Sequence, residues 1–248
     1  MNIDKSLRVI DMPDGVGRDV FEVVNLVAEV AVKISKVISF GNLRDNLGKE
    51  VGENSDGDNQ KALDVFADEQ FLHNLKSSPV KYYASEEQEE LIELNKDGSI
   101  LFAIDPLDGS SNINTNVSIG TIFSLKRANN ILSEANAVEA LLSAGEDQLA
   151  AGYVIYGPQT TLVFTSGQGV DEYILDIEKG RFVRCRSNIR IPSDSAEYSI
   201  NASNYRYWSK PMRACIDDLN LGIDGPAGKN FNMRWVASLV AETHRILI

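Results

Sequence analysis

The 248-residue chain has little cysteine, little histidine and a shortage of basic residues, and each shortage excludes a class of protein. Its two cysteines, Cys185 and Cys215, form no CxxC pair, which excludes a disulfide scaffold and a zinc ribbon. The two histidines, His73 and His244, have no partner at metal-ligand spacing, so we expect both to be structural. The longest apolar segment, residues 20–37, is not expected to span a membrane, because it is interrupted by Glu22, Asn25, Glu29 and Lys33.

Acidic residues dominate the charge of the chain. Asp and Glu total 36 against 24 Lys and Arg, which gives a formal net charge of −12. A surface of this charge repels nucleic acid and anionic lipid, so we expect neither as a partner. It would also repel a phosphorylated metabolite unless cations occupied the binding site. The amino terminus has no basic segment followed by an apolar one, so we expect no secretory signal and a cytoplasmic protein.

Apolar spacing predicts two helices followed by a run of strands. Residues 20–39 and 63–77 each place apolar side chains on one helical face, with Gly41 and Pro79 just beyond their ends. Residues 129–146 show no clear period, and we expect part of that segment to be disordered. Short apolar runs predict strands, the last four as two hairpins, over residues 100–104, 119–125, 152–156, 161–165, 173–176 and 181–184.

A second region is expected to begin near residue 191, which divides the chain into residues 1–188 and 189–248. Its last segment, from Met233, has apolar side chains at helical spacing and predicts a final helix. That helix reaches Ile248 without a cap, and native chains seldom end on an apolar helix face. We therefore expect the natural protein to continue beyond this point, with a remainder that covers the exposed face.

Three acidic clusters carry the chemical signal: Asp58 with Asp64, Glu86 with Glu87, and Asp105 with Asp108. Taken singly, such clusters are more often turns or solvated surface. Gathered in one site, six carboxylates would repel one another unless divalent cations neutralised them. Oxygen ligands without a nearby Cys or His favour a hard ion such as Mg²⁺ or Mn²⁺. The clusters together therefore predict a metal site.

The segment that begins at Asp105 has the outline of a phosphoryl-transfer site. Asp105 is expected to end a buried strand, and Pro106 is expected to turn the chain outward, which frees the Leu107 carbonyl as a further oxygen ligand. Asp108 would point back from that turn. The next residues would open a helix whose unpaired N–H groups bind a phosphate: Gly109, Ser110 and Ser111.

The order of these motifs resembles one known family. The run Asp-Pro-Leu-Asp-Gly-Ser-Ser from Asp105 resembles the signature of the metal-dependent, lithium-sensitive sugar and inositol phosphatases. Further segments make almost the whole chain similar to fructose-1,6-bisphosphatase class I: residues 61–65, 85–87, 117–123, 151–157 and 233–245. The resemblance implies a layered α-β-α-β-α fold of the α/β class with mixed sheets.

The resemblance also implies roles for residues that match the family's motifs. The implied metal ligands are Glu86, Asp105, the Leu107 carbonyl and Asp108. The implied catalytic residues are Asp58, which assists the metals and the departing phosphoryl group, and the pair that positions and deprotonates water, Asp64 and Glu87. The implied ligands of the substrate, including its second phosphate, are Asp108, Gly109, Ser110, Ser111, Asn201, Tyr205 and Arg234.

The implied reaction is Mg²⁺- or Mn²⁺-dependent hydrolysis of fructose 1,6-bisphosphate to fructose 6-phosphate and phosphate, in gluconeogenesis or the Calvin cycle. Water would attack the 1-phosphate in line. The resemblance further implies a dimer or tetramer in which Arg234 reaches across a subunit interface. Two alternatives stay open: a sedoheptulose-1,7-bisphosphatase or dual sugar bisphosphatase, and a non-catalytic truncated homologue. The second is favoured by one departure, since the family continues past Ile248 with a phosphate-binding Tyr and Lys and another metal-ligating Glu.

Overall fold

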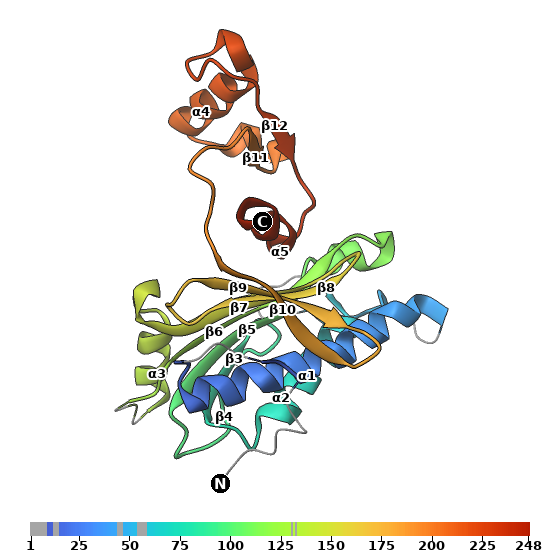
Figure 1. The fold of residues 1–248 in the computed structure, drawn as a ribbon, viewed down its shortest axis with the longest axis vertical. Helices are drawn as coiled ribbons and strands as arrows, with labels where there is room; N and C mark the ends of the chain where they lie inside the picture. Colours follow the sequence, from blue (N-terminus) through green and yellow to red (C-terminus); the bar gives the residue numbers. More distant parts are fainter. Residues whose placement is uncertain (1–8, 12–14, 44–46, 54–58, 130, 132) are drawn as a thin grey trace.

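An eight-stranded sheet lies at the centre of the computed structural model, which describes residues 9–11, 15–43, 47–53, 59–129, 131 and 133–248 (Figure 1). Its strands follow the order β10 (Arg181–Ile189), β9 (Val170–Asp176), β8 (Thr160–Thr165), β7 (Gln148–Tyr156), β6 (Ile119–Arg127), β5 (Ile100–Asp108), β3 (Val80–Ser85) and β4 (Ile92–Glu93). Neighbours are antiparallel except β3 and β5, which are parallel. The predicted strands and both predicted hairpins are confirmed.

Two helices cover one face of this sheet, α1 (Arg18–Phe40) and α2 (Ala62–Leu75) (Figure 1). Both were predicted from apolar spacing, and both are confirmed. The inner side of α1 is completely buried at Val23, Val24, Val27, Val30 and Ala31. Each buried valine stabilises the fold by roughly 1.5–3 kcal/mol relative to an exposed one. Gly41 ends the helix at a φ of +51°, and its N–H donates to the carbonyl of Ile38.

Beneath these helices, three aromatic rings join the strands that carry the acidic motifs. Tyr83 on β3, Phe102 on β5 and Phe123 on β6 are each at most 1% exposed. Their ring centroids lie 5.9 Å and 6.4 Å apart along the row, in nearly parallel planes. Stacked aromatic pairs add about 0.5–1.5 kcal/mol to their apolar burial. The stacked rings therefore pack β3, β5 and β6 together beneath the residues at the ends of β3 and β5.

Helix α3 (Glu134–Leu141) lies in the segment that we expected to be partly disordered, and for these residues that expectation is wrong. Ser133 caps its amino end by accepting from the N–H of Asn136. Its carboxyl end is held by Lys126 of β6, which is only 5% exposed and donates to the carbonyls of Ala140, Leu141, Ser143 and Ala144. A positive charge stabilises the carboxyl terminus of a helix. Here the charge comes from Lys126 on a neighbouring strand, so the sequence of residues 134–141 does not show it.

After β10 the chain leaves the sheet and forms a lobe that contains β11 (Glu197–Ser199), α4 (Lys210–Leu221) and β12 (Asn232–Arg234) (Figure 1). It then returns to the sheet as α5 (Leu239–Leu247), which contacts β6 and β7. The final helix was predicted from Met233, and that start is wrong. Met233 lies in β12, which pairs with β11, and the helix begins only after Ser238, whose hydroxyl accepts from the N–H of Ala241.

The remaining elements are short. They are strands β1 (Glu50–Glu53) and β2 (Asn59–Lys61) and the 3-10 helices η2 (Gly41–Leu43), η3 (Ser110–Thr115), η4 (Gly145–Asp147), η5 (Ala202–Tyr207) and η6 (Gly222–Asp224). Asp58 and residues 54–57 lie outside the described residues. Among the helices of the described part of the chain, none combines the length and the apolarity needed to cross a membrane.

Candidate active site

The carboxyl end of β5 carries two acidic residues on either side of a β-bulge. We expected the strand to end at Asp105 with Pro106 turning outward, but β5 continues through Pro106 to Asp108, so that expectation is wrong. Asp105 lies opposite Ile122 whereas Asp108 lies opposite Gly120, so β5 holds one extra residue there. Proline has no N–H to offer a ladder and is tolerated at such a bulge. The bulge therefore explains how a proline fits between the two aspartates.

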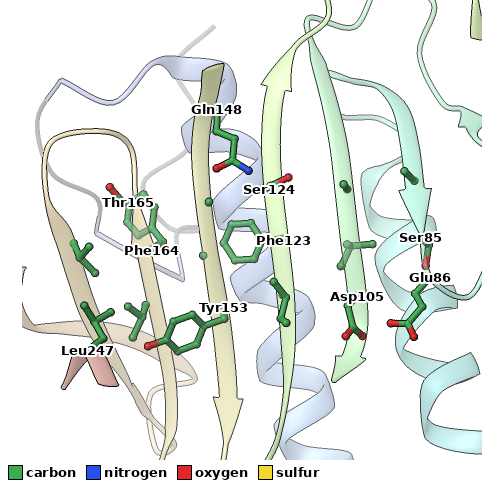
Figure 2. Close-up of a pocket in the computed structure, with 18 residues that line it drawn as sticks. Ser85, Glu86, Asp105, Phe123, Ser124, Gln148, Tyr153, Phe164, Thr165 and Leu247 are labelled. Atoms are coloured by element: carbon green, nitrogen blue, oxygen red, sulfur yellow. The ribbon is translucent and has the colours of Figure 1, made fainter. Parts of the chain in front are cut away.

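The parallel strand β3 brings a second pair of acidic residues to the same edge. Ser85 ends β3 opposite Ile104, and the N–H of Glu86 donates to the Ile104 carbonyl at 3.2 Å. Because parallel strands end at the same edge of a sheet, Glu86 lies beside Asp105. Figure 2 shows the two carboxylates facing each other at the ends of their strands.

Helix α2 contributes Asp64 in its first turn. This residue is 2% exposed, and its Oδ2 accepts from the backbone N–H of Lys61 at 2.6 Å. That contact caps the helix and fixes the side chain. Oδ1 is buried as well and has no hydrogen-bond partner among the described residues. A buried acceptor without a donor is costly, which indicates that water or a ligand pairs with it.

One cavity of about 440 Å³ gathers these groups. It is lined by Lys61, Asp64, Glu86, Glu87, Asp105, Leu107, Asp108, Gly109, Ser110 and Ser111. Every predicted site residue from Asp64 to Ser111 is therefore brought together. Asp58, the other predicted catalytic residue, lies outside the described residues.

Two carboxyl groups of the cavity, those of Asp64 and Asp105, have raised pKa values. Burial raises the pKa of Asp64 to about 7; the N–H of Lys61 opposes the rise, and the nearby charges of Glu87 and Glu86 add to it. Burial likewise raises the pKa of Asp105 well above its ordinary value, helped by the charges of Glu86 and Asp108. Carboxylates crowded in this way ionise fully only when positive charge enters the site.

A second cavity, of about 670 Å³, adjoins the first on the face of the sheet opposite α1 and α2, where Leu247 of α5 also lines it. Glu86 and Asp105 line both cavities. Figure 2 shows the rings of Phe123, Tyr153 and Phe164 spread along the strands beside them. Phe123 and Phe164 belong to the core that α1 and α2 cover, whereas Tyr153 packs with Val240 and Ala241 of α5.

At the other side of the acidic cavity the backbone turns sharply at Gly109. Its φ is +81°, in the left-handed region that favours glycine, and it precedes the six-residue 3-10 helix η3. A Cβ at this position would lie 2.9 Å from the Cβ of Ser238. Glycine is therefore required for two reasons, backbone conformation and close packing. The predicted helix after Gly109 is present, but it is a short 3-10 helix.

Asp108 links the site to the carboxyl-terminal helix. Its carboxylate accepts from the Ser238 hydroxyl at 2.5 Å and from the N–H groups of Leu239 at 3.1 Å and Val240 at 2.8 Å. A carboxylate at a helix amino terminus pairs unsatisfied N–H groups and complements the helix dipole. In this structure, then, the predicted metal ligand Asp108 also caps α5.

Three predicted substrate ligands lie in the lobe and do not line the acidic cavity. Asn201 caps η5 by accepting from the N–H of Ser203 at 3.1 Å. Tyr205 donates to Asp217, and Arg234 pairs with Glu197 at 3.1 Å. The structure therefore does not bring Asn201, Tyr205 and Arg234 to the residues at the ends of β3 and β5.

The donor set fits a hard divalent cation in kind. All candidate ligands offer oxygen, and the unpaired Oδ1 of Asp64 is a further buried acceptor at the same cavity. Within the described part of the chain, no three His, Cys, Asp or Glu side chains converge closely enough to coordinate one ion. The residues that line the cavity thus have the chemistry of a site for a hard cation.

Two family models match this chain. The fructose-1-6-bisphosphatase N-terminal domain matches residues 11–187, and the fructose-1-6-bisphosphatase C-terminal domain matches residues 191–248. The chain belongs to the fructose-1,6-bisphosphatase family.

Curated fructose-1,6-bisphosphatases are similar along almost the whole chain. Two relatives from Cereibacter sphaeroides, both named fructose-1,6-bisphosphatase class 1, are 50% identical over 235 residues and 52% identical over 240 residues. These matches cover 95% and 96% of this chain and 69% and 71% of the relatives. A relative of the same name from Rhodobacter capsulatus is 49% identical over 94% of this chain and 69% of its own length.

Solved fructose-1,6-bisphosphatase structures share the fold. The crystal structure of Leishmania major fructose-1,6-bisphosphatase in holo form matches with a TM-score of 0.85 and 34% identity, over 95% of this chain and 72% of the other. The T-state structure of the same enzyme matches with a TM-score of 0.80 and 32% identity, over the same shares of the two chains. The predicted α/β fold of the fructose-1,6-bisphosphatase family is confirmed.

Two residues at this acidic cavity were not predicted as site residues from the sequence. Lys61 lines the acidic cavity, and its ammonium pairs with Glu50 of β1 at 2.7 Å. Ser238 lies against Gly109 and donates to Asp108, across 130 positions of sequence. The place of Lys61 just before a helix was visible in the sequence, whereas nothing local pairs Ser238 with Asp108.

Proposed function

We propose that this chain is a phosphatase that hydrolyses the 1-phosphate of fructose 1,6-bisphosphate, which releases fructose 6-phosphate and phosphate. One observation carries the proposal: a single cavity gathers Asp64, Glu86, Glu87 and Asp105 beside the turn at Gly109. Carboxylates that can hold a cation next to backbone N–H groups suit phosphoryl transfer. The choice of sugar is supported by relatives named fructose-1,6-bisphosphatase class 1.

In this proposal, Asp64 and Glu87 position the attacking water and accept its proton. The unpaired Oδ1 of Asp64 offers an acceptor inside the cavity. A pKa of about 7 suits a general base that works near neutral pH, because about half of the groups are then ionised and the ionised form is basic enough to take a proton. Asp58, with its place in the sequence shortly before α2, is proposed to assist the departing phosphoryl group.

The phosphate that is cleaved is proposed to bind at Gly109, Ser110 and Ser111. The positive φ of Gly109 turns the chain at the cavity wall, and Ser110 and Ser111 line the same cavity directly after it. Backbone N–H groups and the two hydroxyls would then donate to phosphate oxygens.

A divalent metal, Mg²⁺ or Mn²⁺, would supply positive charge that offsets the carboxylates and the substrate phosphate. Glu86, Asp105, the Leu107 carbonyl and Asp108 are the residues proposed to hold it. The raised pKa of Asp105 supports this, because a site that disfavours its own negative charge gains most from a cation. Glu86 and Asp105 face each other in Figure 2, as two ligands of one ion would.

We propose residues 1–188 as the metal- and phosphate-binding domain and residues 189–248 as the sugar-phosphate-binding domain. Asn201, Tyr205 and Arg234 would hold the second phosphate, with Arg234 donated across an interface of a homodimer or homotetramer. Arg234 pairs with Glu197 in the single chain, so that ion pair would have to open. Light scattering after gel filtration tests the assembly, and a strictly monomeric active chain would contradict the role of Arg234.

A role in carbohydrate metabolism follows from the proposed reaction, and we propose the cytoplasm as its place, with neither nucleic acid nor membrane as a partner. The main alternative is a sedoheptulose-1,7-bisphosphatase or a dual sugar bisphosphatase, because binding pockets discriminate only modestly between sugars that differ by one carbon. A non-catalytic homologue is the other alternative.

Phosphate release tests the proposed function. The 248-residue chain is assayed with fructose 1,6-bisphosphate and with sedoheptulose 1,7-bisphosphate, each with and without Mg²⁺. We expect Mg²⁺-dependent release that is faster with the fructose substrate and absent in Asp105→Ala. Faster release from the sedoheptulose substrate would favour the first alternative, and no release from a folded chain would favour the second.

A further inference from the structure

A buried carboxylate that does not line the acidic cavity lies one helical turn behind Asp64. Asp68 on α2 is 2% exposed and accepts three side-chain hydrogen bonds. Its Oδ1 accepts from the Tyr83 hydroxyl at 2.7 Å and from the Ser85 hydroxyl at 2.6 Å. Its Oδ2 accepts from Nε2 of Gln88 at 2.5 Å. Both oxygens of a fully buried carboxylate are therefore engaged.

Two of these donors stand at the two ends of one turn. Residues 85–88, which we call the acidic turn, close with the N–H of Gln88 donating to the Ser85 carbonyl at 3.2 Å. The Ser85 hydroxyl also accepts from the N–H of Glu87 at 3.2 Å. Asp68 is therefore hydrogen-bonded to the first and the last residue of the acidic turn. Glu86 and Glu87 lie between those two residues.

The acidic turn needs such an anchor because of what it carries. Glu86 and Glu87 lie beside Asp105 and Asp64, and like charges at this spacing repel one another. Repulsion would push the turn away from the ends of β5 and α2. Two of the short hydrogen bonds to the Asp68 carboxylate, those from Ser85 and Gln88, oppose that movement, since charge-assisted bonds are about twice as strong as neutral ones.

We propose that Asp68 is a positioning residue: it holds the acidic turn in place so that Glu86 and Glu87 meet Asp105 and Asp64 in one site. The inference rests on the proposed function, because that function gives the acidic turn its chemistry. Asp68 itself touches neither the substrate nor the reacting water. It acts through Ser85 and Gln88, as the residues behind metal ligands commonly do.

Mn²⁺ binding, followed by electron paramagnetic resonance on the 248-residue chain, tests the inference without relying on turnover. Asp68→Ala frees both ends of the acidic turn, and we expect Mn²⁺ affinity to fall about 10- to 100-fold. Asp68→Asn keeps one acceptor oxygen for Ser85, and its amide can donate to the side-chain oxygen of Gln88, so affinity should stay within about threefold of the wild type. Phosphate release should show the same ranking, with the loss in kcat larger than the change in KM.

Tyr83→Phe is the matched control. It removes one hydrogen bond from the same carboxylate but leaves Ser85 and Gln88 attached, so stability should fall while Mn²⁺ affinity stays unchanged. Equal affinity in Asp68→Ala and the wild type would overturn the proposal, and so would a loss in Tyr83→Phe as large as in Asp68→Ala. If Asp68→Ala does not fold, Gln88→Ala replaces it: this variant breaks the Oδ2 bond at a partly buried position, and unchanged affinity there would overturn the proposal.

The outcomes separate this inference from the proposed function. A wild type that releases phosphate, with Asp68→Ala equal to it in binding and rate, overturns only the positioning role. A wild type that binds Mn²⁺ but releases no phosphate overturns the proposed function, and the ranking of Mn²⁺ affinities then still decides whether Asp68 positions Glu86.

Discussion

Replacing Asp64 by Asn should make the metal-free protein more stable, and increasingly so as the pH rises. Asp64 has an ordinary pKa of 3.8 and a pKa of about 7 in the folded chain, where burial is the main cause of the rise. Each unit of difference corresponds to about 1.4 kcal/mol, so holding this carboxylate charged costs the fold up to about 4 kcal/mol above pH 7. Asn keeps an acceptor for the Lys61 N–H but cannot ionise.

The direction of this pH dependence follows from the number of protons that the folded and unfolded chains bind. Between pH 4 and 7 the folded chain keeps the Asp64 proton while the unfolded chain has released it, so stability falls as the pH rises through this window. Below the unfolded pKa both states are protonated and the cost is absent. Asp105 has a raised pKa as well, but it is present in both proteins, so the comparison of Asp64→Asn with the wild type isolates Asp64.

Urea unfolding in EDTA at pH 5 and pH 8, followed by circular dichroism, measures the effect. We expect the stability advantage of Asp64→Asn to grow by about 2–4 kcal/mol between the two pH values. Adding Mg²⁺ at pH 8 should stabilise the wild type more than the variant, because a cation offsets the buried charge. An advantage that is the same at pH 5 and pH 8 would refute the reasoning.

Three further substitutions test particular contacts. Gly109→Ala should lower the free energy of unfolding by about 2 kcal/mol, since it forces a positive φ and meets Ser238, and urea unfolding measures this. Lys126→Met leaves the carbonyls at the end of α3 without their donor, so hydrogen exchange in residues 134–141 should become faster, with a stability loss of about 2–3 kcal/mol. Ser238→Ala removes the cap of α5 and one hydrogen bond to Asp108. We expect the free energy of unfolding to fall by about 0.5–2 kcal/mol, which a lower thermal midpoint would show.

Elements whose signal is local were predicted from the sequence. Helix α1 shows its buried face as a repeat of valines and ends at a glycine, and both features lie within one segment. The β7–β8 hairpin likewise has two apolar runs on either side of a short loop. Such elements can be predicted because the residues that determine their structure lie close together in the sequence.

Elements that depend on distant partners were missed or misplaced. Helix α3 is completed by Lys126 from a strand, and Met233 is a strand residue because β12 pairs with β11, some 35 positions earlier. Pro106 stays within β5 because the strand bulges against β6. In the site, the acidic residues have a visible sequence motif, whereas Asp68 meets the acidic turn across 17 to 20 positions and could be found only from the fold.

We propose that the cavity at the ends of β3 and β5 is a metal-dependent phosphatase site in which Asp64 acts on water. The most direct measurement is phosphate release from fructose 1,6-bisphosphate by the wild type and by Asp64→Asn, as a function of Mg²⁺ concentration. We expect Mg²⁺-dependent release by the wild type and a rate about 10²- to 10⁴-fold lower in the variant. Equal rates in the two proteins, or no release from a folded wild type that binds Mn²⁺, would contradict it.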